Sequence, residues 1–141
     1  MSTKSKWLTF LAVMILLVAG GCAKPKPAGL TDAQVASLTE NILKALDAND
    51  YQTFTQDFSD QMDAAFTQEQ FTKLQAMLQT ASGKYISIGT AALTNSQGYA
   101  TYRFPCKYEK ETVYVTITFL IGGQKVEGLY FDSVNLRKAS Q

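Results

Sequence analysis

An alternation of apolar and polar side chains over residues 98–121 constrains the fold of this chain more than any other feature of its sequence. A β-strand turns successive side chains to opposite faces, so the pattern predicts two antiparallel strands that bury one face of a sheet. We take Lys110-Glu111 as the two-residue turn between them, which places Glu109 opposite Thr112. The apolar pairs on the buried face are then Tyr108–Val113, Cys106–Val115, Phe104–Ile117, Tyr102–Phe119 and Ala100–Ile121. A slip of one residue would turn this whole set toward solvent.

Two further strands are expected, one on each side of this pair. The predicted strands cover about residues 84–93, 98–109, 112–121 and 125–136. Gly122-Gly123 separates the last two, and glycine is favoured in two-residue hairpin turns because it accepts a positive φ. The sheet is therefore predicted to be antiparallel and four-stranded, with one apolar face.

Three amphipathic helices are predicted before the sheet. Thr31 and Thr67 each stand three residues before a glutamine, which is the capping-box arrangement of a helix start. Asp50 is the predicted N-cap of a shorter helix between them, and Gly83 suits the left-handed residue that ends the third. These elements predict an α+β fold in which three N-terminal helices pack on one face of a curved four-stranded antiparallel sheet.

The order of these elements resembles the cystatin-like and nuclear-transport-factor-2-like superfold, which forms a cone. More narrowly, "ENILKALDANDYQTFTQDFSDQMDAAFTQEQFTKLQ" and "KVEGLYF" look like domain-of-unknown-function family 3887, which is common in bacterial lipoproteins. The resemblance covers roughly residues 33–134. It implies the cone-shaped fold and brings no established catalytic residues with it.

The N-terminal segment is predicted to direct export. Lys4 and Lys6 precede an apolar run over residues 7–19, which is shorter than the roughly 20 residues of a membrane span and typical of a secretory signal. The following "AGGC" resembles the lipobox of bacterial lipoproteins, which implies that Cys22 carries the lipid (palmitate among its acyl chains) and that the chain is cut before it. An uncleaved membrane anchor is the alternative, and either one tethers the domain to a membrane.

This resemblance sets the expected organisation and location of the chain. The predicted parts are residues 1–21 as a removed signal peptide, 22–29 as the lipidated cysteine and a Lys/Pro linker, 30–137 as a single α+β domain and 138–141 as a C-terminal tail. The protein is expected on the outward face of the cell membrane, or on the outer membrane if the source has two, because Ala23 rather than a retention aspartate follows the cysteine.

Composition excludes several kinds of site. The chain has no histidine, which excludes Ser-His and Cys-His nucleophile pairs and His-ligated zinc. Its net charge of +1 does not favour a nucleic-acid partner, and we predict no cofactor. Asp57, Asp60 and Asp63 lack the spacing of a calcium loop, so we interpret them as a solvated face and predict no metal site. Cys106, inward between aromatic residues, is expected to act as a small hydrophobe.

One acid falls on the predicted buried face. The Gly122-Gly123 turn places Asp132 opposite Val113 and near Tyr108, and an acid beside a phenol can transfer a proton or orient a ligand. Tyr130 is a second phenol within reach on the same strand. A bulge at Gly128 would reverse the faces beyond it and turn Asp132 to solvent, so both orientations stay open.

Three functions remain open on these grounds. The leading hypothesis is a non-enzymatic module of the cell envelope that holds a small apolar ligand or a partner protein in the cleft between helices and sheet. The side chains expected to line that cleft are Tyr102, Phe104, Tyr108 and Tyr130. The alternatives are a small isomerase- or dehydratase-like enzyme that uses Asp132 with Tyr108 or Tyr130, and a structural or assembly component of the envelope. The oligomeric state is not predicted.

Overall fold

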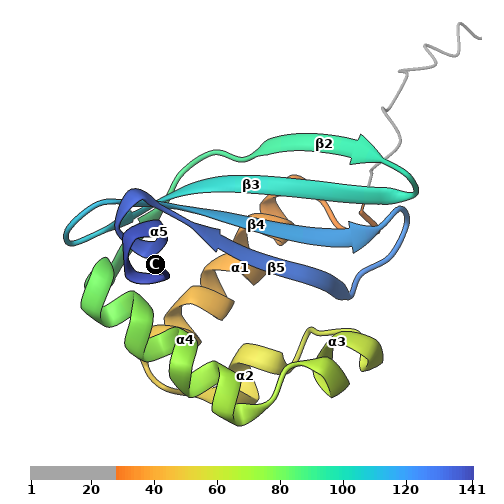
Figure 1. Ribbon diagram of the computed structural model, residues 1–141. Helices are drawn as coiled ribbons and strands as arrows, with labels where there is room; N and C mark the ends of the chain where they lie inside the picture. The colour runs from red at the N-terminus through yellow and green to blue at the C-terminus, as the bar shows by residue number, and fades with distance from the viewer. Residues whose placement is uncertain (1–27) are drawn as a thin grey trace, which may run out of the picture.

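One face of an antiparallel sheet is covered by helices in the computed structural model, which describes residues 28–141 (Figure 1). The helices are α1 (Asp32–Asp47), α2 (Tyr51–Thr55), α3 (Asp60–Ala65), α4 (Gln68–Ala81) and α5 (Val134–Ala139). The strands are β1 (Tyr85–Ile88), β2 (Ala92–Ser96), β3 (Tyr99–Tyr108), β4 (Thr112–Leu120) and β5 (Val126–Asp132). The predicted α+β class is confirmed, although the helices and strands are more numerous than expected.

The predicted helix starts are confirmed in atomic detail. The backbone N–H of Gln34 donates to the Thr31 hydroxyl over 3.2 Å, and the Gln34 side chain accepts from the Thr31 N–H over 2.8 Å. Thr67 and Gln70 form the same box at the start of α4. Asp50 caps α2, as predicted. Gly83 follows α4 with a φ of 79°, the left-handed conformation that its position predicts.

Two helices, α3 and α5, were missed, the first because a contact distant in sequence separates it from α2. The expected second helix stops at Thr55, and Ser59 caps the separate helix α3. Between them, the N–H of Val126 donates to the backbone carbonyl of Asp57, and the N–H of Ser59 donates to the backbone carbonyl of Val126, each over 2.9 Å. This bridge to β5 takes the backbone out of helical geometry. The predicted fourth strand ends early for a local reason, since Ser133 caps α5.

The predicted first strand is divided into β1 and β2, and both pair with β3. The break falls at Gly89, whose N–H donates to the carbonyl of Pro105 over 2.8 Å. Pro105 lies on β3 and has no N–H to return a ladder hydrogen bond. The regular pairing of this edge therefore lapses opposite the proline and resumes at Ala92, which pairs with Arg103.

The predicted register between β3 and β4 was wrong by two residues. Lys107 pairs with Thr112 and Cys106 with Val113, and the turn is closed by a hydrogen bond of 3.0 Å from the Tyr108 N–H to the Glu111 carbonyl. The turn residues are thus Glu109-Lys110. A shift of two leaves every side chain on its predicted face, so the apolar set is still buried.

The β4–β5 pairing contains the bulge that would turn Asp132 outward. Phe119 pairs with Val126, as the Gly122-Gly123 turn predicts, but Thr118 pairs with Gly128, which leaves Glu127 as the extra residue. The Glu127 carboxylate accepts a hydrogen bond of 2.8 Å from the Ser59 hydroxyl. The inward orientation of Asp132 is therefore wrong.

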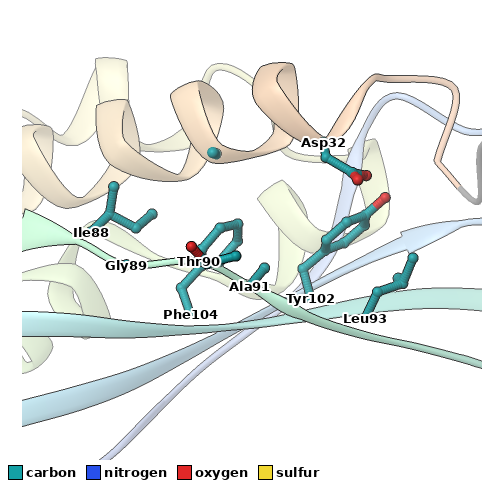
Figure 2. A pocket seen from close by; sticks show the side chains of 9 residues that line it. Asp32, Ile88, Gly89, Thr90, Ala91, Leu93, Tyr102 and Phe104 are labelled. Atoms are coloured by element: carbon teal, nitrogen blue, oxygen red, sulfur yellow. The ribbon is translucent and has the colours of Figure 1, made fainter.

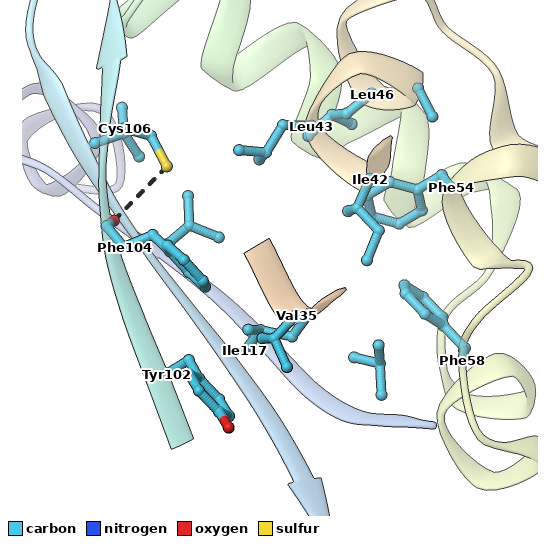
Figure 3. Close-up of a cluster of buried hydrophobic side chains, with 14 of the residues drawn as sticks. Val35, Ile42, Leu43, Leu46, Phe54, Phe58, Tyr102, Phe104, Cys106 and Ile117 are labelled. Carbon is cyan, nitrogen blue, oxygen red and sulfur yellow. Dashed lines mark hydrogen bonds between the residues drawn. The ribbon is translucent and has the colours of Figure 1, made fainter. Parts of the chain in front are cut away.

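The core lies between the inner face of the sheet and the helices α1, α2 and α4 (Figure 3). Phe54 is fully buried, and its ring centroid lies 5.0–5.5 Å from those of Phe58, Phe66 and Phe71. The inner-face residues of β3 and β4 are buried against the other side of α1. No helix within residues 28–141 is long and apolar enough to cross a bilayer.

Candidate functional site

A pocket of about 410 Å³ lies between the first turns of α1 and the break in the edge strand (Figure 2). It is lined by Asp32, Ala36, Ile88, Gly89, Thr90, Ala91, Leu93, Tyr102 and Phe104. Its size falls within the range of small-molecule sites, about 300–1,000 Å³. The pocket therefore has room for a small organic molecule.

The local sequence explains why side chains leave this space empty. Asp32 and Ala36 are four residues apart on α1, so they present the same face of the helix to the sheet. Three of the lining positions, Ala36, Gly89 and Ala91, carry a methyl group or no side chain at all. Because the edge strand is interrupted at Gly89, no row of inward side chains from residues 28–141 fills the gap between β3 and α1.

The hydroxyl of Tyr102 is the most informative polar group in the pocket. Tyr102 is 1% exposed, and no group among residues 28–141 meets its hydroxyl with good hydrogen-bond geometry, although the Ala28 backbone and the Asp32 carboxylate lie near enough to affect its pKa. Figure 2 shows this hydroxyl and the Asp32 carboxylate pointing toward one another. Burial, and then the charge of Asp32, raise the pKa of Tyr102. A buried hydroxyl without a partner costs about 1–3 kcal/mol, which a ligand could recover.

The pocket combines an apolar body with two polar groups of opposite kind. Phe104 and Ile88 supply apolar surface, and Leu93, which is 41% exposed, stands at the mouth. The phenol can donate a hydrogen bond and the carboxylate can accept one. Asp32 lies in the first turn of α1, where the helix dipole favours a negative charge. The arrangement suits an apolar molecule with one hydroxyl or amine, which can accept from Tyr102 and donate to Asp32.

The four aromatic residues predicted to line the cleft are not all brought together. Tyr102 and Phe104 line the pocket. Tyr108 is buried away from it and packs edge-on against Tyr85, with ring centroids 5.8 Å apart. Burial raises the pKa of Tyr108. Tyr130 is 63% exposed on the outer face of the sheet, where the bulge has placed it.

The structure does not place Asp132 beside Tyr108 in a cleft, and both Asp132 and Tyr130 lie on the outer face of the sheet. Asp132 lies opposite Tyr114 on the outer face, whereas Tyr108 faces the core. Its carboxylate forms ion pairs with Arg137 over 3.1 Å and with Arg103 over 3.8 Å. Asp132 thus joins α5 to the sheet. Tyr114, an exposed aromatic residue, has one ring face covered by the Arg103 guanidinium, 3.8 Å from its centroid.

Asp32 and the Gly89–Ala91 segment were missed as site residues. Asp32 follows the Thr31 cap, and acids are common in the first turn of a helix for reasons of stability alone. The available signal was the break in alternation at "SIGTAAL", where small residues replace the expected inward side chains. These small residues indicate a pocket only when α1 is known to lie across this segment of the sheet.

Cys106 is fully buried, and its thiol lies 3.7 Å from the Phe104 carbonyl (Figure 3). Burial raises its pKa to about 12, so the thiol stays protonated at neutral pH. Among residues 28–141, no three acidic or cysteine side chains are grouped as metal ligands. The predicted signal peptide, Cys22 and most of the Lys/Pro linker lie outside the described residues.

Comparison with known families gives one match. A family model described as "Protein of unknown function (DUF3887)" matches residues 39–129, which include most of the helical layer and all of β3 and β4. Among curated proteins, none matches the chain. Asp32 and Ala36 precede the matched region, whereas the β1–β2 break and Tyr102 lie inside it.

Proposed function

This chain belongs to the family described as proteins of unknown function (DUF3887), and we propose from its pocket that it is a non-enzymatic binding module. The ligand is a small apolar molecule with one hydroxyl or amine. The single observation that carries this proposal is the buried, unpartnered hydroxyl of Tyr102 inside a pocket of about 410 Å³. We further propose that the fold is a form of the cystatin-like cone, in which helices and sheet enclose such a site.

A pair of matched probes tests the ligand class. We expect 1-naphthol, which has one hydroxyl, to bind more tightly than naphthalene, which has none. Tyr102→Phe should weaken 1-naphthol binding about 2- to 12-fold, the effect of one neutral hydrogen bond, and leave naphthalene binding unchanged. Fluorescence titration measures both. Equal affinity for the two probes in the unmodified protein would exclude the proposed polar contact.

Two alanines on the same helix provide a matched pair for locating the site. Ala36 lines the pocket, and Ala33 is exposed outside it. Ala36→Trp should fill the pocket and abolish binding of both probes, whereas Ala33→Trp should leave it intact. Binding that survives Ala36→Trp would place the probe elsewhere on the protein.

The enzyme alternative would use a different carboxylate–phenol pair from the expected Asp132 with Tyr108 or Tyr130. The carboxylate and phenol that face one another in a pocket are Asp32 and Tyr102. An isomerase- or dehydratase-like activity would use Asp32 as the base and the phenol as a hydrogen-bond donor. Recovery of the natural bound compound, unaltered after prolonged incubation with the protein, would argue for binding and against turnover.

We also propose that the module is a lipid-anchored protein of the cell envelope, with Cys22 as the lipidated residue. Support comes from the short apolar run and the "AGGC" stretch. Cys22→Ala is expected to abolish incorporation of radiolabelled palmitate, because the sulfur that receives the lipid is gone. The matched control is Cys106→Ala, which removes a buried thiol and should keep the label. Label that persists in Cys22→Ala would refute the assignment.

A further inference from the structure

The two hairpin turns at one end of the sheet expose apolar side chains. Tyr99 is 42% exposed, Leu120 is 47% and Ile121 is 54%. Tyr99 and Leu120 are directly paired across β3 and β4, so their side chains lie together on the outer face. Ile121 follows in the next turn. We call these three residues the apolar tip.

The apolar tip is held as one unit. The N–H of Ile121 donates to the carbonyl of Gly98 over 2.9 Å, which joins the β2–β3 turn to the β4–β5 turn. The N–H of Gly123 donates to Leu120 over 2.8 Å and closes the second turn. The exposed side chains are therefore preorganised, and little conformational entropy remains to be lost when they meet a partner.

The charges around the tip favour a particular partner. Residues 92–102 and 116–126 contain no aspartate or glutamate, and Lys125 is the single charged residue in these two segments. These two turn segments therefore bring no acid of their own to repel anionic lipid headgroups, and an aromatic residue such as Tyr99 is favoured at the membrane–water interface.

The chain also enters the domain beside the tip. The N–H of Gly29 donates to the Gly123 carbonyl over 2.7 Å, and the Gln124 side chain donates to the Gly29 carbonyl over 3.2 Å. Figure 1 shows the start of the described chain at the same end as the two turns, with α5 and the C-terminus at the opposite end. Five residues lie between Cys22 and Ala28, and the six residue-to-residue steps span about 20 Å when the chain is fully extended.

We propose that the apolar tip is a membrane-contacting surface, inserted at the level of the lipid headgroups. The inference rests on the proposed membrane anchor, which would hold the tip within reach of the bilayer. This contact would set the orientation of the domain, because the end of the sheet that carries the β2–β3 and β4–β5 turns would then face the membrane. The pocket mouth at Leu93 lies on β2, a short distance along the same strand from the membrane-contacting end.

The test uses the purified full chain reconstituted in vesicles of phosphatidylethanolamine and phosphatidylglycerol. Ile121→Cys and, as a matched control, Tyr130→Cys are labelled with an environment-sensitive maleimide before reconstitution. The vesicles contain phosphatidylcholine with a nitroxide close to the headgroup. Interfacial side chains lie within about 5–10 Å of the headgroup boundary, so we expect at least about twofold stronger quenching at position 121 than at position 130. Leu120→Cys is a second tip position, should the first variant fold poorly.

The outcomes separate this inference from the proposed anchor. Equal quenching at the tip and at position 130, in a chain that floats with the vesicles, would overturn the membrane-contacting surface alone. Label taken up by the parent chain would reveal a free Cys22 and overturn the lipid assignment, because Cys106 is buried. The difference in quenching between positions 121 and 130, after the signal of the labelled parent chain is subtracted, would then still show whether the apolar tip faces the membrane. Quenching that is stronger at position 130 would also reject the proposal.

Discussion

Phe54→Ala is expected to lower the free energy of unfolding by about 3–5 kcal/mol, the cost of removing a buried aromatic ring and leaving a cavity. Phe54 is fully buried and contacts Phe58, Phe66 and Phe71 with ring centroids 5.0–5.5 Å apart. Helix α2 has five residues, too few to be stable by itself, so this cluster is what holds it against the rest of the domain.

Urea unfolding followed by circular dichroism measures this loss. The matched control is Tyr130→Ala, which also removes an aromatic ring but at a position 63% exposed, and should change stability by no more than about 0.5 kcal/mol. A loss below about 1 kcal/mol for Phe54→Ala would mean that the cluster is loosely packed or that the cavity collapses.

Glu111→Ala is expected to cost about 2–3 kcal/mol, because it removes the acceptor of several hydrogen bonds at once. The Glu111 carboxylate accepts from the Ser82 hydroxyl over 2.6 Å, from the Ser133 hydroxyl over 2.7 Å and from the Asn135 N–H over 3.1 Å. Both serines are buried, so their hydroxyls would be left without this partner. The group joins the end of α4, the β3–β4 turn and the start of α5.

The same carboxylate predicts a pH dependence. Desolvation raises the pKa of Glu111, but the hydrogen bonds from Ser82, Ser133 and Asn135 outweigh it and the net pKa is lowered. Its contribution is therefore complete above the unfolded pKa of about 4.3 and is lost as the pH falls through the lower folded pKa.

Comparison with an isosteric variant isolates this effect. Glu111→Gln should be less stable than the parent at neutral pH, and the difference should shrink below about pH 4 as the parent carboxylate is protonated. Glu69→Ala removes a highly exposed carboxylate and serves as the control, with a loss of no more than about 0.5 kcal/mol. A difference between parent and Glu111→Gln that is constant with pH would contradict the assigned role of the charge.

Features that depend on neighbouring residues could be predicted from the sequence. The capping boxes at Thr31 and Thr67 are local patterns, and the structure reproduces both. The alternation over residues 98–121 correctly predicted the buried face of β3 and β4. The same pattern has a period of two, so it could not distinguish the true register from one shifted by two residues. The carboxylate network of Glu111 favours the register observed, and it includes residues far apart in the chain.

The β5 bulge and the position of Asp32 could not be predicted either, because both depend on contacts between residues far apart in the chain. The bulge at Glu127 is supported by its hydrogen bond with Ser59, a residue of the helical layer. Tyr102 and Phe104 could be predicted to point inward, because the alternation along the strand assigns both side chains to the apolar face. Asp32 could not be connected to them, since only the packing of α1 across the sheet brings the first turn of the helix to the phenol.

The break in the edge strand at Gly89 also affects how the protein meets copies of itself. A long, regular edge offers unpaired N–H and C=O groups to a strand from another molecule, which is how sheets extend into fibrils. Here one edge is divided into strands of four and five residues, and the opposite edge, β5, carries a bulge and a short bridge to Phe58. Within residues 28–141, neither edge presents a continuous template. Molecules crowded on one surface can therefore come into contact without their sheets joining strand to strand.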